Sequence, residues 1–229
     1  MKFVKANGLS IGFGVLFLVA LTLQAIAGYN EFNNDEVTHA HLLHQQADTI
    51  SFGRYLTSSE FGQAVMENWQ SEYLQFSLFI FGTIWLLQRG SPESKEPDKV
   101  GLESDRDQRV GEHAGPGSPR WARVGGLRTW IYSNSLLIVM TAIFFGSWFA
   151  HSVTGWSAYN ADQLDHQEDT LSWVSYLGSA NFWQATLQNW QSEFLAVGSM
   201  AILSVYLRQR GSPESKPVGA PHDATAAEG

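Results

Sequence analysis

The sequence predicts an all-α membrane protein, with four transmembrane helices in two tandem hairpins and short interfacial helices on the outer face. Two observations lead to this fold class. Long apolar runs alternate with polar segments, and one pattern of polar end, apolar run and polar end occurs twice, at an offset of 121 residues. The composition agrees, because charged residues make up only 16% of the chain, whereas about 25% is usual in soluble domains.

The repeated pattern has identical polar ends. Each copy begins with Asn-Trp-Gln-Ser-Glu, at residues 68–72 and 189–193, and closes with Gln-Arg-Gly-Ser-Pro-Glu-Ser-Lys, at 88–95 and 209–216. The apolar runs between these ends share only two leucines. Each copy therefore predicts one membrane-crossing helix with a fixed polar cap at each end.

Residues 9–28 form the first predicted span, because twenty predominantly apolar residues match a hydrocarbon thickness of about 30 Å. A cleaved secretory signal is the competing interpretation, since Lys2 and Lys5 precede the apolar run and Ala25-Ile26-Ala27 resembles a cleavage site. Residues 9–28 correspond, at an offset of 127, to the third predicted span, which no signal peptidase removes. The repeat therefore favours a retained span over loss of residues 1–27.

The remaining spans are predicted at 69–88, 133–152 and 188–207. Only fifteen residues of largely apolar character follow Glu72, which is too short for a crossing helix. The second span must therefore include part of the Asn-Trp-Gln-Ser-Glu stretch. Glu72 then lies about one turn of 5.4 Å inside the outer boundary.

The chain divides into two hairpin repeats, which cover residues 1–95 and 121–216. Between them, residues 96–120 contain prolines, glycines and mixed charges without helical or strand periodicity, which predicts a flexible cytoplasmic linker. Residues 217–229 form a flexible tail. Two hairpins of the same orientation imply a pseudo-twofold axis along the membrane normal.

Basic residues predict the orientation, because lysine and arginine are enriched in cytoplasmic loops. Thirteen of the fourteen lie in the N-terminal segment, the central loop or the tail, and only Arg54 lies in the opposite connections. These positions predict a multi-pass protein of the cytoplasmic (inner) membrane with both termini in the cytoplasm. In the outer connection 29–67, we expect interfacial helices with Phe52, Tyr55 and Phe61 on the bilayer surface.

The two Asn-Trp-Gln-Ser-Glu stretches are each followed by a span that ends in Arg-Gly-Ser-Pro-Glu-Ser-Lys. In these motifs the chain resembles an uncharacterised bacterial family of integral membrane proteins, a domain of unknown function. The resemblance covers residues 1–218. It implies a bacterial cytoplasmic-membrane protein and carries over no activity.

The first candidate site is a polar vestibule near the outer face. A charged side chain at the centre of a membrane helix costs about 2.5–3.5 kcal/mol on insertion scales and usually faces the bundle interior or water. Because Glu72 and Glu193 occupy equivalent positions, one interpretation is a shared site for a proton, a cation or a polar ligand. The other is that both glutamates compensate the positive end of a helix. The predicted vestibule consists of Glu72, Glu193, Asn68, Asn189, Gln70 and Gln191.

Four residues are predicted to anchor the spans at the membrane interfaces. Trp69 and Trp190 suit the aromatic belt of the outer interface, and Arg89 and Arg210 suit the level of the cytoplasmic headgroups. Capping and anchoring leave the identical Glu-Ser-Lys endings unexplained. A cytoplasmic protein partner that docks on residues 209–216 is one interpretation of these endings.

Other kinds of site have less support. His39, His41 and His44 stand near carboxylates and are weak candidates for a metal site, with a solvated acidic loop as the alternative. The chain has no cysteine, which excludes thiolate chemistry. A net charge of −8 argues against a nucleic-acid partner. Because no catalytic or nucleotide-binding motif occurs, we expect neither enzymatic activity nor a cofactor.

These observations predict a non-enzymatic structural or accessory protein that lies in the lipid bilayer. Its expected partners are lipid, a membrane or cytoplasmic protein, or a second copy of itself. A small transporter or channel that uses Glu72 and Glu193 is the alternative. The two functions differ in a measurable way, since only the second requires an ion flux that depends on these glutamates.

Overall fold

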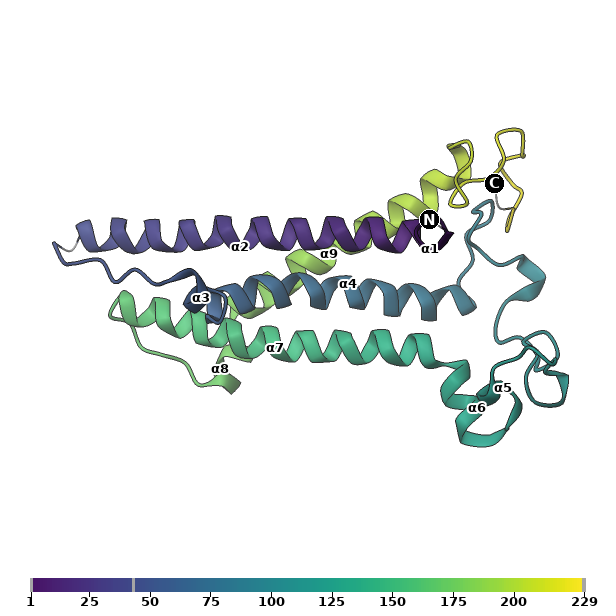
Figure 1. Cartoon of the computed structure of the whole chain (residues 1–229), viewed down its shortest axis with the longest axis horizontal. Coiled ribbons are helices and arrows are strands. Elements are labelled where there is room, and N and C mark those ends of the chain that lie inside the picture. The colour runs from purple at the N-terminus through teal and green to yellow at the C-terminus, as the bar shows by residue number, and fades with distance from the viewer. Residues whose placement is uncertain (1, 43, 228–229) are drawn as a thin grey trace. The chain divides into compact units, whose positions relative to one another are not determined.

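The computed structural model describes residues 2–42 and 44–227, and all regular elements within these ranges are helices (Figure 1). The long helices are α2 (Gly8–Leu42), α4 (Ser59–Trp85), α7 (Ser135–Asp165) and α9 (Ala180–Tyr206). The short elements are α1 (Lys2–Ala6), α3 (Phe52–Tyr55), α5 (Arg120–Arg123), α6 (Gly126–Ser133), α8 (Trp173–Leu177), η1 (Pro97–Lys99) and η2 (Gly111–His113). The all-α prediction is confirmed.

Two of the long helices, α2 and α7, are sufficiently long and apolar to cross a membrane, judged by length and composition. The helices α4 and α9 have 27 residues each, which corresponds to about 40 Å at 1.5 Å per residue. Their N-terminal halves are more polar, because they contain the Asn-Trp-Gln-Ser-Glu motifs. The membrane prediction is therefore supported for α2 and α7, and α4 and α9 stay predicted spans.

Both apolar helices extend beyond the spans predicted at 9–28 and 133–152. The helix α2 continues to Leu42, and α7 continues to Asp165. The segment from Tyr29 to Leu42 contains neither proline nor glycine, so no residue in it stops the helix at the membrane boundary. The first part of each predicted outer connection is therefore a continuation of the preceding helix.

The chain forms two compact units. The first comprises the described residues up to Val65 together with Val153–Leu171, and the second comprises Met66–Ser152 and the described residues from Ser172 onward. The first unit thus contains α1, α2, α3, the start of α4 and the end of α7. The second contains α5, α6, α8, α9 and the remaining parts of α4 and α7.

The first unit is organised around Tyr55 of α3. This side chain is only 5% exposed, and its ring packs against Tyr29, Phe32 and Phe61 at centroid distances of 6.1, 6.0 and 5.5 Å. Gly28 permits this packing, because a Cβ at that position would overlap the Tyr55 hydroxyl. The prediction that Tyr55 lies on the bilayer surface is wrong. Its ring instead packs against three other aromatic rings, and such contacts stabilise a buried aromatic side chain.

The same local hydrogen bonds recur in the two outer connections. Asn33 Oδ1 accepts a hydrogen bond from the Ile50 N–H at 2.9 Å, and Asn160 Oδ1 accepts one from the Leu171 N–H at 2.9 Å. Serine hydroxyls then cap the following helices, at Ser51 and Ser58 in one connection and at Ser172 and Ser179 in the other. Segments that repeat in the sequence therefore fold with equivalent hydrogen bonds.

The second unit has an aromatic centre between α7 and α9. The Trp148 ring of α7 lies 6.1 Å from Phe182, 6.2 Å from Trp183 and 5.9 Å from Trp190, measured between ring centroids. Phe182 and Tyr176 of α8 are buried. This centre fixes the N-terminal half of α9, which carries the second Asn-Trp-Gln-Ser-Glu motif.

Candidate functional site

The helices α4 and α9 carry the repeated motifs, and their Asn-Trp-Gln-Ser-Glu stretches meet within the second unit. Trp190 Nε1 donates a hydrogen bond to Gln70 Oε1 at 2.6 Å, and Asn189 Nδ2 donates one to Glu67 Oε1 at 2.7 Å. Gln70 is fully buried. The repeated stretch is therefore a contact between helices, in which one copy hydrogen-bonds with the other.

The structure also brings Glu72 and Glu193 together. The two carboxylates are close enough for like-charge repulsion, and the neighbouring Ser71 hydroxyl donates to the Asn68 carbonyl at 2.9 Å. Glu193 is half-buried, whereas Glu72 is exposed. Neighbouring carboxylates of this kind can share a proton or attract a cation.

The other predicted vestibule residues differ between the copies. Gln70 is buried whereas Gln191 is exposed, and Asn189 is half-buried whereas Asn68 is exposed. The contact therefore uses different residues of the same motif on the two helices. Gln70 contributes from α4, and Asn189 and Trp190 contribute from α9.

The predicted interfacial anchors have different surroundings. Trp69 is half-buried, and Trp190 packs against the aromatic rings of α7. Arg89 and Arg210 are exposed. Arg89 forms an ion pair with Asp223, with 3.7 Å between the guanidinium nitrogen and the carboxylate oxygen. Both arginine side chains are thus accessible, and their role as membrane anchors stays a prediction, while Trp190 packs in the protein interior.

The two Gln-Arg-Gly-Ser-Pro-Glu-Ser-Lys stretches, residues 88–95 and 209–216, are termed the closing motifs, and they fold alike. The Gln88 N–H donates to Ser94 Oγ at 3.0 Å, and the Gln209 N–H donates to Ser215 Oγ at 2.8 Å. The glycines at positions 90 and 211 have φ angles of +85° and +82°, a conformation that favours glycine. Glycine and serine therefore close a compact turn after each helix.

The lysine at the end of each closing motif binds backbone carbonyls. Lys216 is 1% exposed, and its ammonium group donates to three carbonyl oxygens of the tail, those of Pro221, His222 and Ala224. Lys95 donates to the Gly101 carbonyl at 2.9 Å. These bonds explain the serine and lysine that capping and anchoring alone leave unexplained.

The glutamates of the closing motifs, Glu93 and Glu214, form a carboxyl pair. Their side chains are hydrogen-bonded, which raises the pKa of Glu93 to about 7, with burial and the charge of Glu214 as further causes. The carboxyl pair therefore shares one proton below about pH 7 and loses it as the pH rises further. Sequence reasoning missed this pair, although the identical glutamate in both copies was an available signal.

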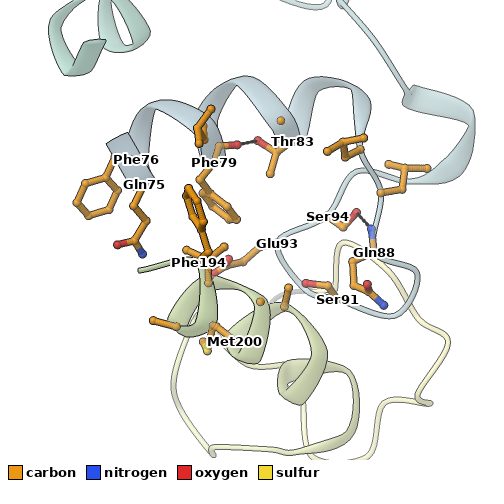
Figure 2. Close-up of a pocket in the computed structure, with 18 residues that line it drawn as sticks. Gln75, Phe76, Phe79, Thr83, Gln88, Ser91, Glu93, Ser94, Phe194 and Met200 are labelled. Carbon is orange, nitrogen blue, oxygen red and sulfur yellow. Dashed lines mark hydrogen bonds between the residues drawn. The ribbon is translucent and has the colours of Figure 1, made fainter. Parts of the chain in front are cut away.

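A cavity of about 560 Å³ lies between α4 and α9, beside the carboxyl pair. Its walls are largely apolar and include Phe79, Phe194 and Met200. Residues of the first closing motif line one end, namely Gln88, Ser91, Glu93 and Ser94. Figure 2 shows the Glu93 side chain reaching into the space between the two helices. The volume falls within the range of about 300–1,000 Å³ that is typical of ligand sites.

The candidate metal histidines lie in and after the end of α2. The His39 ring stacks on His166 at 5.8 Å between centroids, while His41 and His44 are exposed. Within residues 2–42 and 44–227, no group of three or more His, Asp or Glu side chains is placed to hold a metal ion. The geometry therefore gives no support to a metal site here.

Comparisons with curated proteins and with solved structures find no match. A family model, by contrast, matches nearly the entire chain, from residue 1 to residue 227. This extent includes both repeated motifs, the carboxyl pair and the cavity. The chain therefore belongs to the family DUF6766, which is described as a domain of unknown function.

Proposed function

We propose that the protein is a non-enzymatic, multi-pass protein of the bacterial cytoplasmic membrane that binds a membrane-dissolved amphiphile between α4 and α9. It has four spans in two tandem hairpins, formed by α2 with α4 and by α7 with α9. The distribution of lysine and arginine supports cytoplasmic termini. In this orientation the closing motifs lie at the level of the cytoplasmic headgroups.

The observation that carries the proposal is the uneven polarity of the cavity. Its walls are largely apolar, whereas Gln88, Ser91 and Glu93 offer hydrogen-bonding groups at one end. In the proposed orientation, the apolar walls lie at the depth of the lipid tails and the polar end lies near the headgroups. An amphiphile with an apolar body and one polar end is complementary to both parts.

Gly198 of α9 provides a way to fill the cavity. It lines the cavity, and a Cβ added at this position would meet no atom within 4 Å. Gly146 of α7 is equally open to additional atoms and lies away from the cavity lining. Gly198→Leu therefore fills the cavity, and Gly146→Leu is its matched control.

Photolabelling of the full chain in lipid nanodiscs tests the proposal, with a monoacylglycerol that carries a diazirine in its acyl chain as the probe. We expect the label to concentrate on peptides of α4 and α9. The yield there should fall at least fivefold in Gly198→Leu and stay unchanged in Gly146→Leu. Label spread evenly over all helices, or equal yields in the two variants, would contradict binding in the cavity.

A small transporter is the second candidate, favoured by acidic pairs at both ends of the α4–α9 contact. Glu72 and Glu193 repel each other at one end, and the carboxyl pair shares a proton at the other. Replacing Glu72 and Glu193 by glutamine should then abolish a pH-dependent flux in proteoliposomes without unfolding the protein. A wild-type chain that supports no flux under any ion or pH gradient would contradict transport.

A further inference from the structure

We infer that the ligand of the α4–α9 cavity is a lipophilic monocation, that is, a singly charged cation with apolar substituents. Its binding displaces the proton shared by Glu93 and Glu214. This inference rests on the proposed function, because it specifies the chemical class of the amphiphile that the cavity binds. It adds an exchange reaction in which one cation enters and up to one proton leaves to solvent.

The charge at the polar end of the cavity is the first argument. Lys95 pairs with Glu103 at 3.1 Å, and Lys216 donates to backbone carbonyls. Two arginines are also engaged, since Arg89 pairs with Asp223 and Arg208 donates to the carbonyls of Val205, Leu207 and Ala220. Within the described ranges, no basic side chain forms an ion pair with the carboxyl pair. The carboxyl pair therefore lacks a cation from the protein itself.

The aromatic wall is the second argument. Phe76, Phe79 and Phe194 line the cavity, and the faces of aromatic rings attract cations through the negative charge of their π electrons. The same rings contact the apolar groups of a ligand. An inorganic cation gains little from such a wall, whereas a quaternary ammonium or phosphonium ion with apolar substituents matches both the rings and the carboxylates.

The ends of the two helices are the third argument. The C-terminus of a helix carries partial negative charge and favours cations. Arg208 already occupies this position after α9, where it donates to the carbonyls of Val205 and Leu207. The equivalent position after α4 holds Leu87, which lines the cavity. A cation in the cavity can therefore take, beside α4, the role that Arg208 has beside α9.

The shared proton sets the direction of the pH dependence. The pKa of Glu93 is raised to about 7 by its hydrogen bond with Glu214, so the carboxyl pair carries one negative charge in acid and two in base. A cation binds more tightly to the doubly charged pair. For one proton with this pKa, affinity should rise about tenfold between pH 6 and pH 8.

His222 and Asp223 are further titratable groups at the same end of the unit, in addition to Lys95 and Glu103. His222 contacts Arg208 at 3.4 Å, and Asp223 pairs with Arg89. Because a histidine also titrates between pH 6 and 8, His222→Gln serves as a control. Glu112→Gln is a second control, because Glu112 is an exposed carboxylate outside the cavity.

Isothermal titration of the purified full chain with tetraphenylphosphonium, at pH 6 and pH 8, tests the inference. We expect the affinity of the wild type to be about tenfold higher at pH 8. Glu93→Gln and Glu214→Gln should each bind at pH 8 about as weakly as the wild type does at pH 6, without pH dependence. His222→Gln and Glu112→Gln should behave as the wild type.

Neutral triphenylphosphine oxide separates this inference from the proposed function. If it binds as tightly as the cation, and the two glutamine variants change nothing, the cation inference is overturned while binding in the cavity stands. If neither compound binds and Gly198→Leu leaves diazirine labelling unchanged, both the inference and the proposed function are overturned. If only Glu93→Gln fails to fold, the Glu214→Gln variant decides the outcome.

Discussion

The packing of α2 against α3 predicts that Gly28→Ala lowers the free energy of unfolding. The added Cβ would overlap the Tyr55 hydroxyl and lie 3.1 Å from the ring carbon that bears it. Tyr55 is enclosed by other aromatic rings and is 5% exposed, so it has little room to move. Overpacking of this kind costs about 1–3 kcal/mol, whereas alanine in place of a helical glycine otherwise gains about 0.5–1 kcal/mol.

Two further variants isolate the steric overlap. Gly14→Ala is a matched control in the same helix, because its Cβ would meet no atom within 4 Å. Tyr55→Phe removes the overlapping oxygen. The double variant Gly28→Ala/Tyr55→Phe should therefore recover at least about 1 kcal/mol relative to the sum of the single changes.

Chemical denaturation in detergent micelles, followed by circular dichroism, yields the free energies of unfolding for this cycle. We expect Gly28→Ala to be less stable than the wild type and Gly14→Ala to be at least as stable. If both alanine variants are equally stable, or if Tyr55→Phe gives no recovery in the double variant, the close contact between α2 and α3 is refuted.

Three other predictions concern the bonds of Lys216, the protonation of Glu93 and the retention of residues 1–27. Lys216→Met should lower the free energy of unfolding by about 1–3 kcal/mol, because three carbonyl groups of the tail lose their buried donor. In limited proteolysis, the tail of Lys216→Met should be cut sooner than the tail of the comparison variant Lys95→Met. The pKa of Glu93 is raised from 4.5 to about 7, so its stabilising contribution is complete below pH 4.5 and is lost as the pH rises through 7. The melting temperature should accordingly fall more between pH 5 and pH 8 in the wild type than in Glu93→Gln. Protein purified from membranes should keep residues 1–27, and an intact mass smaller by that segment would instead support a cleaved signal.

Helix content could be predicted from sequence because helix formation depends on local signals, whereas the serine and lysine bonds of the closing motifs could not. The glycine at position 90 and the proline at position 92 indicate that no helix continues through the closing motif, although α4 already ends at Trp85, before both residues. The thickness of a membrane predicted that the first span ends at residue 28, whereas α2 continues to Leu42. Residues 29–42 continue the helix outside the apolar run, because helix formation requires no apolar sequence.

The candidate site was predictable only where equivalent positions in the two copies pointed to it. Glu72 and Glu193 are identical residues at equivalent positions inside predicted spans, and the structure brings them together. The carboxyl pair of Glu93 and Glu214 was missed because its shared proton depends on two loops that meet in space. The burial of Tyr55 likewise depends on a close approach between segments distant in sequence.

The most direct test of the central claim, that the α4–α9 cavity exchanges a proton for a lipophilic cation, is the number of protons released on binding. Titration with tetraphenylphosphonium at pH 7, in two buffers of different ionisation enthalpy, measures this number. Since the pKa of Glu93 is about 7, the account predicts release of about half a proton per cation in the wild type and none in Glu93→Gln. Cation binding by the wild type with no proton release would contradict it.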